Sequence, residues 1–85
     1  MKGTIVYLLK IEEIYDYEKF NEEEVYSSLE EAKKEFDRLA YNARKEAEKD
    51  EWIIETDDSM AFTAYLDGEY SCNHVEISID KKVIK

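Results

Sequence analysis

Few side chains in this sequence have the type and spacing that chemistry needs, and the first pair to weigh is Cys72 and His74. They are the only cysteine and the only histidine, and they stand two residues apart. On a strand this spacing places both side chains on one face, where a nearby carboxylate would complete no more than a weak metal site. The simpler interpretation makes Cys72 a small hydrophobe and His74 a surface residue. We therefore expect no metal site.

The sequence also gives little support to catalysis. Cys72 and His74 would have parallel side chains, and no third group is identifiable to orient the histidine so that it activates a thiol. Carboxylates are so abundant that proximity alone nominates no pair of acid and base. Neither "ETDDS" nor "YLDGEY" has the ligand spacing of a calcium loop, and Gly3 and Gly68, the only glycines, form no phosphate-binding loop. We expect no catalytic residues, no cofactor and no enzymatic activity.

The segment "IYDYEKFNEEEVY", residues 14–26, mixes aromatic and acidic side chains and has Lys19 as its only base. Residues 11–26 carry seven acids against that lysine, and residues 46–58 carry seven more against Lys49. Aromatic side chains supply buried area at interfaces and acids supply steering, so the mixture suits a surface that docks on a basic groove. The alternative is a solvated face that keeps the protein soluble. The sequence does not show whether the two acidic groups form one surface.

If the segment is a binding surface, its contact residues come from both acidic groups. The side chains expected to contact a partner are Tyr15, Asp16, Tyr17, Glu18, Glu22, Glu23, Glu24, Asp57 and Asp58. The aromatic residues also have a structural alternative, in which Tyr15, Tyr17 and Phe20 fold back to cover the end of the core. We expect this of at least one of them, and Phe20 is the first choice.

Length and charge bound the class of protein. Eighty-five residues predict one domain, residues 1–85, and the net charge of -10 makes nucleic acid an unsuitable direct ligand. A basic protein partner fits this charge better. The single cysteine and the lack of a signal-peptide pattern predict a cytoplasmic protein, and the longest apolar run near the start, residues 5–9, is too short to span a membrane. Both a monomer and a homodimer remain open.

Periodicity predicts the elements of the first half of the chain. Residues 4–14 alternate as a strand whose first positions are apolar on both faces, so we place it inside a sheet. Residues 24–26 can pair back on it as a short second strand, with the acidic segment as the hairpin loop. Ser28 and Glu31 have capping-box spacing and predict a helix start. The helix has an apolar stripe and a solvent side that carries Tyr41; the stripe consists of Leu29, Ala32, Phe36, Leu39, Ala40, Ala43 and Ala47.

The second half of the chain predicts three further strands. They cover residues 51–56, 59–66 and 73–80, separated by turns at Asp57–Asp58 and Asp67–Gly68. In the last strand Val75, Ile77 and Ile79 alternate with polar residues, so one face should pack and the other meet water. The predicted class is therefore α+β: a small antiparallel sheet in the order β-β-α-β-β-β, with one long amphipathic helix packed on one face.

The chain as a whole resembles small acidic uncharacterised proteins of bacteria, phages and mobile elements. The likeness covers most of residues 4–80 and rests on "IVYLLKIEE", the acidic connector, "VYSSLEEAKKEFDRL" and "FTAYLDGEYSCNHVEISI". It transfers no functional residues. In its size, its acidity and its likeness to proteins of phages, the chain is also similar to phage-encoded anti-defence proteins. These include anti-CRISPR proteins, which block basic nucleic-acid channels. By analogy, the resemblance implies an inhibitor.

These observations favour a non-catalytic binding protein, an inhibitor of the anti-CRISPR kind. It would act as a nucleic-acid mimic, presenting carboxylates where the basic surface of a nuclease or CRISPR effector receives phosphates. The first alternative is an immunity or antitoxin-like protein, or a host regulatory protein-interaction module, which a neighbouring toxin gene would favour. The second alternative, an enzyme, requires a concave pocket with convergent polar groups.

Overall fold

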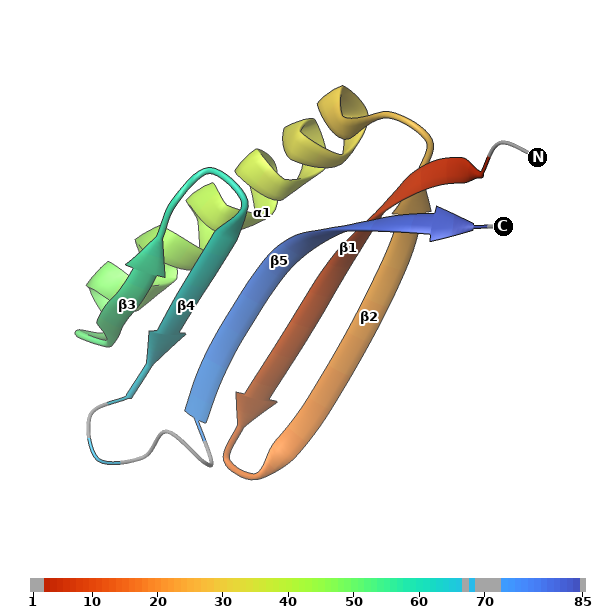
Figure 1. Cartoon of the computed structure of the whole chain (residues 1–85). Coiled ribbons are helices and arrows are strands. Elements are labelled where there is room, and N and C mark those ends of the chain that lie inside the picture. The colour runs from red at the N-terminus through yellow and green to blue at the C-terminus, as the bar shows by residue number, and fades with distance from the viewer. Residues whose placement is uncertain (1–2, 67, 69–72, 85) are drawn as a thin grey trace.

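The computed structural model describes residues 3–66, 68 and 73–84, and within them a five-stranded antiparallel sheet carries one long helix (Figure 1). Along the chain the elements are β1 (Thr4–Tyr15), β2 (Glu18–Tyr26), α1 (Leu29–Lys49), β3 (Ile53–Asp57), β4 (Ala61–Tyr65) and β5 (Asn73–Ile84). In space the strands lie in the order β2-β1-β5-β4-β3. The predicted class and the predicted order of elements are both confirmed.

The first two strands form a hairpin that is much longer than predicted. β1 lies inside the sheet between β2 and β5, as expected, and β2 pairs with it from Tyr7↔Tyr26 to Tyr15↔Glu18. The acidic segment is therefore a strand, and the prediction that it forms the hairpin loop is wrong. The loop consists of Asp16 and Tyr17 alone, with φ of 49° and 72° as in a type I′ turn. β2 is an edge strand whose side chains are mostly exposed, so its pairing with β1, and not a buried pattern, makes it a strand.

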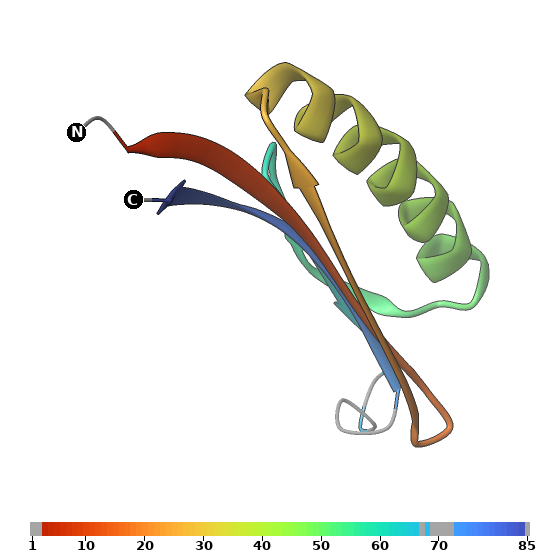
Figure 2. The ribbon, with the colours of Figure 1, turned by 90° about the vertical axis from the view of Figure 1, so that its right-hand side faces the viewer.

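The helix begins where the capping-box spacing predicts. Ser28 is the N-cap, with φ of -127° and ψ of 134°, and its Oγ accepts a hydrogen bond from the Glu31 N–H at 3.4 Å. Figure 2 shows the helix lying across one side of the sheet, which leaves the other side of the strands uncovered by any described helix. No helix among the described residues is long and apolar enough to cross a membrane.

The main core lies between this helix and the sheet. Every residue of the predicted helical stripe belongs to it or packs against it, and Phe36, Phe62 and Leu9 are fully buried. Tyr41 is 54% exposed, which confirms the assigned helix face. Val6 and Leu8 are also buried, but they point to the opposite face of the sheet and lie outside this cluster.

Two predictions about single side chains are wrong. Phe20 was expected to cover the end of the core, but it is 55% exposed, because it lies on edge strand β2 at a position the helix does not cover; Tyr15 packs against the core instead. His74 was expected at the surface, but it is only 6% exposed, since it lies on β5 between β1 and β4, opposite Ile14 and Tyr65. Cys72 and Asp67 lie outside the described residues, and Gly68 has the positive φ that the predicted turn requires, 78°.

Candidate functional site

The side of the β1–β2 hairpin that faces α1 is rich in carboxylates. Directly opposite residues of two antiparallel strands share a face, and Glu24, Glu22 and Glu18 lie opposite Leu9, Ile11 and Tyr15, three residues of the core side. Glu13 lies on the same side, opposite Phe20. The β2 residues on this side are exposed and the β1 residues are buried or half-buried. The hairpin thus presents a row of acids beside the helix.

The C-terminal half of α1 brings further acids to this row. Burial raises the pKa of Glu13, and the charges of Glu46 and Glu22 raise it further. Burial likewise raises the pKa of Tyr15 to about 12, assisted by Glu13, Glu46 and Asp50. The two acidic groups of the sequence therefore meet in part. We call the set Glu13, Glu18, Glu22, Glu24, Glu46 and Asp50 the acidic face.

A pocket of about 140 Å³ opens on the acidic face, between α1 and β1. Carboxylates of Glu13, Glu46 and Asp50 border it, together with Tyr15 and Asn42. Tyr15 and Trp52 also line it, and their rings pack with centroids 5.9 Å apart and an interplanar angle of 41°. The remaining lining is apolar and consists of Ile11, Leu39, Ala43, Ala47, Ala64, Val75 and Ile77. The structure therefore supplies the concave pocket that the enzyme alternative required, although the ionisable groups around it are carboxylates and one phenol.

The turn at the tip of the hairpin carries two of the predicted contact residues. The Asp16 N–H donates a hydrogen bond to Oδ1 of Asn73 at 3.2 Å, which fixes the turn to the start of β5. Tyr17 projects from the turn and is 82% exposed. Glu23 points to the opposite face of the sheet from the other β2 glutamates, at the position paired with Lys10. The predicted contact residues of the hairpin are thus divided between its tip, the acidic face and its reverse side.

Asp57 and Asp58 lie away from this surface. Asp57 ends β3, which is at the opposite edge of the sheet from β2, and Asp58 follows it. The Asp57 carboxylate accepts two hydrogen bonds from Arg44, from Nε at 2.8 Å and from Nη2 at 2.6 Å. The structure therefore does not bring these two acids together with the hairpin residues.

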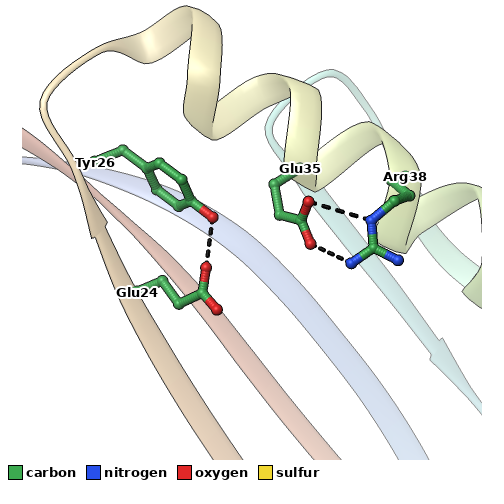
Figure 3. A network of polar contacts seen from close by, with 4 residues as sticks. All are labelled: Glu24, Tyr26, Glu35 and Arg38. Carbon is green, nitrogen blue, oxygen red and sulfur yellow. Dashed lines mark hydrogen bonds and ion pairs between the residues drawn. The ribbon is translucent and has the colours of Figure 1, made fainter.

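Two polar pairs lie near each other, one at the end of β2 and one in the first half of α1 (Figure 3). The Tyr26 hydroxyl donates a hydrogen bond to Oε2 of Glu24, and this bond is the main reason that the pKa of Tyr26 is raised to about 12. On the helix, Arg38 donates to both carboxylate oxygens of Glu35, and these bonds hold the pKa of Glu35 below its ordinary value. Glu24 therefore has a hydrogen-bond partner within the protein.

Among the described residues, one group of side chains has the donor types of a metal site. On the sheet face away from α1, Glu12, His74 and Glu76 place one ligand atom each within 4.8 Å of one another. His74 Nε2 is 3.8 Å from Oε1 of Glu12, and Lys19 Nζ is 3.5 Å from the same oxygen. Two carboxylates and one imidazole suit a divalent ion such as Zn²⁺ or Mn²⁺. The Lys19 ammonium group already offsets part of the charge that would attract such an ion.

Sequence reasoning missed the pocket residues Glu13, Glu46, Asp50 and Trp52. One signal was present, because Glu13 stands between Ile11 and Tyr15 on the apolar side of its strand. The meeting of Glu13 with Glu46 depends on where the helix crosses the sheet, which no local pattern encodes. Searches with this chain found no matching family model, curated protein or solved structure.

Proposed function

We propose that this chain is a non-catalytic inhibitor that docks its acidic hairpin on a basic, nucleic-acid-binding surface of a partner protein. The kind of partner is a nuclease or CRISPR effector, and the chain would act in the cytoplasm as a nucleic-acid mimic of the anti-CRISPR type. The hairpin supports this because it combines carboxylates, exposed aromatic rings and a free strand edge in one element. Each of these has a separate role in binding.

The observation that carries the proposal is Tyr17. An aromatic side chain that is 82% exposed occupies a turn position with φ of 72°, where glycine is the favoured residue. A left-handed conformation is costly for a bulky residue, and such strain is concentrated at functional sites. Tyrosine supplies large contact area at a low cost in side-chain entropy, so its placement at the tip suits recognition.

The edge strand adds the charge and the backbone groups. β2 is nine residues and about 30 Å long, and within the described chain no strand pairs with its outer side. A second copy of the same edge would bring Glu18, Glu22 and Glu24 against like charges, which disfavours self-pairing. A basic surface would instead attract these carboxylates and steer the encounter.

The test is competition with nucleic acid on purified nucleases and CRISPR effectors. Release of a labelled oligonucleotide is followed by fluorescence anisotropy, and binding kinetics are measured at low and high salt on any effector that responds. We expect the variant Glu22→Gln, Glu23→Gln, Glu24→Gln to associate about tenfold more slowly and to depend less on salt, because long-range attraction sets the association rate.

A second triple variant provides the matched control. Glu30→Gln, Asp37→Asn and Glu55→Gln remove the same charge from exposed positions outside the hairpin. This control should compete as the parent does. Equal loss in both triple variants would assign the effect to net charge, and no loss in either would make the hairpin a solvated strand; each result contradicts the proposal.

A further inference from the structure

The pocket between α1 and β1 has features that the docking of a hairpin does not require. We propose that this pocket binds an organic ammonium ion: a primary amine on a short apolar stem, seated with its stem inside and its charge at the carboxylate border. This goes beyond the proposed function, because it concerns an ammonium group held in the pocket and does not depend on the docking of the hairpin. Four observations carry it.

The first observation is the size and character of the interior. At about 140 Å³ the pocket is close to the roughly 150 Å³ apolar cavity of another protein that takes up benzene. Its inner wall is formed by side chains such as Ile11, Leu39 and Ile77. A stem of about five or six carbon atoms would therefore be buried against carbon.

The second observation is the distribution of charge at the border. Three acids line the pocket: Glu13 on β1, Glu46 on α1, and Asp50, which is the C-cap of α1. No basic side chain among the described residues forms an ion pair with any of the three. Elsewhere Arg44, Arg38, Lys10 and Lys19 each pair with an acid. A ligand cation would supply the missing countercharge.

The third observation is that acids stand where a helix disfavours them. The C-terminal end of a helix carries negative partial charge, so basic residues are favoured there. The last turn of α1 and its C-cap instead carry Glu46, Glu48 and Asp50, with Lys49 as the only base. Local rules of this kind are broken at functional sites, where the cost is balanced by binding. Both the helix end and its acids favour a cation in the pocket.

The fourth observation is the aromatic pair at the edge. Tyr15 and Trp52 both line the pocket, are partly buried and pack against each other at an angle. The face of an aromatic ring attracts an ammonium group within about 6 Å, and tryptophan is the strongest of the rings. The raised pKa of Tyr15 reflects the same negative surroundings, because burial and three nearby carboxylates disfavour its ionised form.

The sequence provides a direct reporter for the test. Trp52 is the only tryptophan in the chain, so intrinsic tryptophan fluorescence reports this pocket alone. Isopentylamine and isopentanol have nearly the same shape, do not absorb where tryptophan does, and differ in charge. We expect isopentylamine to change the Trp52 emission with saturation, to bind at least about tenfold more tightly than isopentanol, and to weaken as salt is added.

Two charge variants on the helix separate the pocket from the general acidity of the protein. Glu46→Gln removes a carboxylate at the border, whereas Glu48→Gln removes one two residues away that does not line the pocket. Both side chains are exposed, so both variants should fold. We expect Glu46→Gln to weaken isopentylamine binding several-fold and Glu48→Gln to leave it nearly unchanged.

A blocked lysine, Nα-acetyl-lysine amide, distinguishes a free amine from a side chain of another protein as the source of the ligand. If the blocked lysine binds more tightly than isopentylamine, the ligand is a protein side chain. If it binds more weakly, the ligand is a free amine. Either result supports an ammonium site. Equal affinity for isopentylamine and isopentanol, no saturable change in Trp52 emission, or equal effects of Glu46→Gln and Glu48→Gln would each overturn the proposal. None of these results bears on the hairpin.

Discussion

Arg44 on α1 holds Asp57 at the end of β3 through two parallel hydrogen bonds, 2.8 and 2.6 Å long. The guanidinium carbon also lies 6.0 Å from the ring centroid of Phe62. The pair therefore joins the helix to the sheet edge that is farthest from the hairpin. It gives Asp57 a structural role in the fold, although the sequence placed this residue among the expected partner contacts.

This ion pair should contribute a measurable coupling energy. In a double-mutant cycle with Arg44→Met and Asp57→Asn, chemical denaturation should give a coupling of about 0.5 to 1 kcal/mol, because the bonds are bidentate but the pair is partly exposed. Arg44 holds the pKa of Asp57 below its ordinary value of 3.8. The contribution is therefore present above that value and is lost as pH falls through the lowered pKa. A coupling of zero at neutral pH would show that the pair is incidental.

The helix face gives a second prediction. Phe36 is 2% exposed and belongs to the core cluster, so Phe36→Ala should cost about 3 to 5 kcal/mol and leave so small a protein mostly unfolded. Tyr41→Ala is the control, because its ring contacts Lys45 on the solvent side and should change stability by about 0.5 kcal/mol or less. Thermal melts followed by circular dichroism compare the two. The reverse order of effects would contradict the burial of Phe36 against the sheet.

Glu13 gives a prediction about pH. Its pKa is raised in the folded protein above the ordinary 4.5, chiefly by burial, so the folded state binds more protons than the unfolded state in the window just above 4.5. Stability should therefore fall as pH rises through that window and stay lower beyond it. Glu13→Gln should be more stable than the parent at neutral pH and less dependent on pH. Urea denaturation between about pH 4 and pH 7 measures this. The same gain in Glu55→Gln, an exposed acid elsewhere, would deny Glu13 a special environment.

The elements that the sequence predicted well are those whose pattern records burial. The stripe around Phe36 and the alternation of Val75, Ile77 and Ile79 both describe faces that enter the core. β2 has no such pattern of buried residues, because an edge strand with exposed side chains needs only backbone pairing to β1. The turn of this hairpin was also not predicted, because its sequence lacks the usual glycine. Asp16 followed by glycine would have signalled a type I′ hairpin, but Tyr17 occupies the glycine position.

The candidate site was predictable only in part. Composition and spacing predicted an acidic, aromatic hairpin, and the structure shows Tyr17 and the β2 glutamates exposed on it. The pocket depends on the angle at which α1 crosses the sheet, because that angle brings Glu46 to Glu13. Small residues in the helix, Ala43 and Ala47, leave its volume unfilled. Alanines at this spacing are also typical of a helix that packs closely on a sheet. The sequence alone therefore could not distinguish a pocket from a close contact.

The last prediction concerns Tyr17 and sets stability against binding. Tyr17→Gly removes a bulky residue from a left-handed conformation, φ 72°, and should stabilise the fold by up to about 1 kcal/mol after the greater flexibility of glycine in the unfolded chain is counted. The same change removes the exposed ring at the tip of the hairpin, so it should speed dissociation from an inhibited effector and leave the association rate almost unchanged, because no charge is lost. Denaturation curves measure the change in stability, and surface plasmon resonance measures the dissociation rate. The control is Tyr41→Ala, because glycine at position 41 would weaken the helix. If Tyr17→Gly dissociated as slowly as the parent, Tyr17 would not contribute to recognition, and the proposal that the hairpin tip contacts a partner would have to be abandoned.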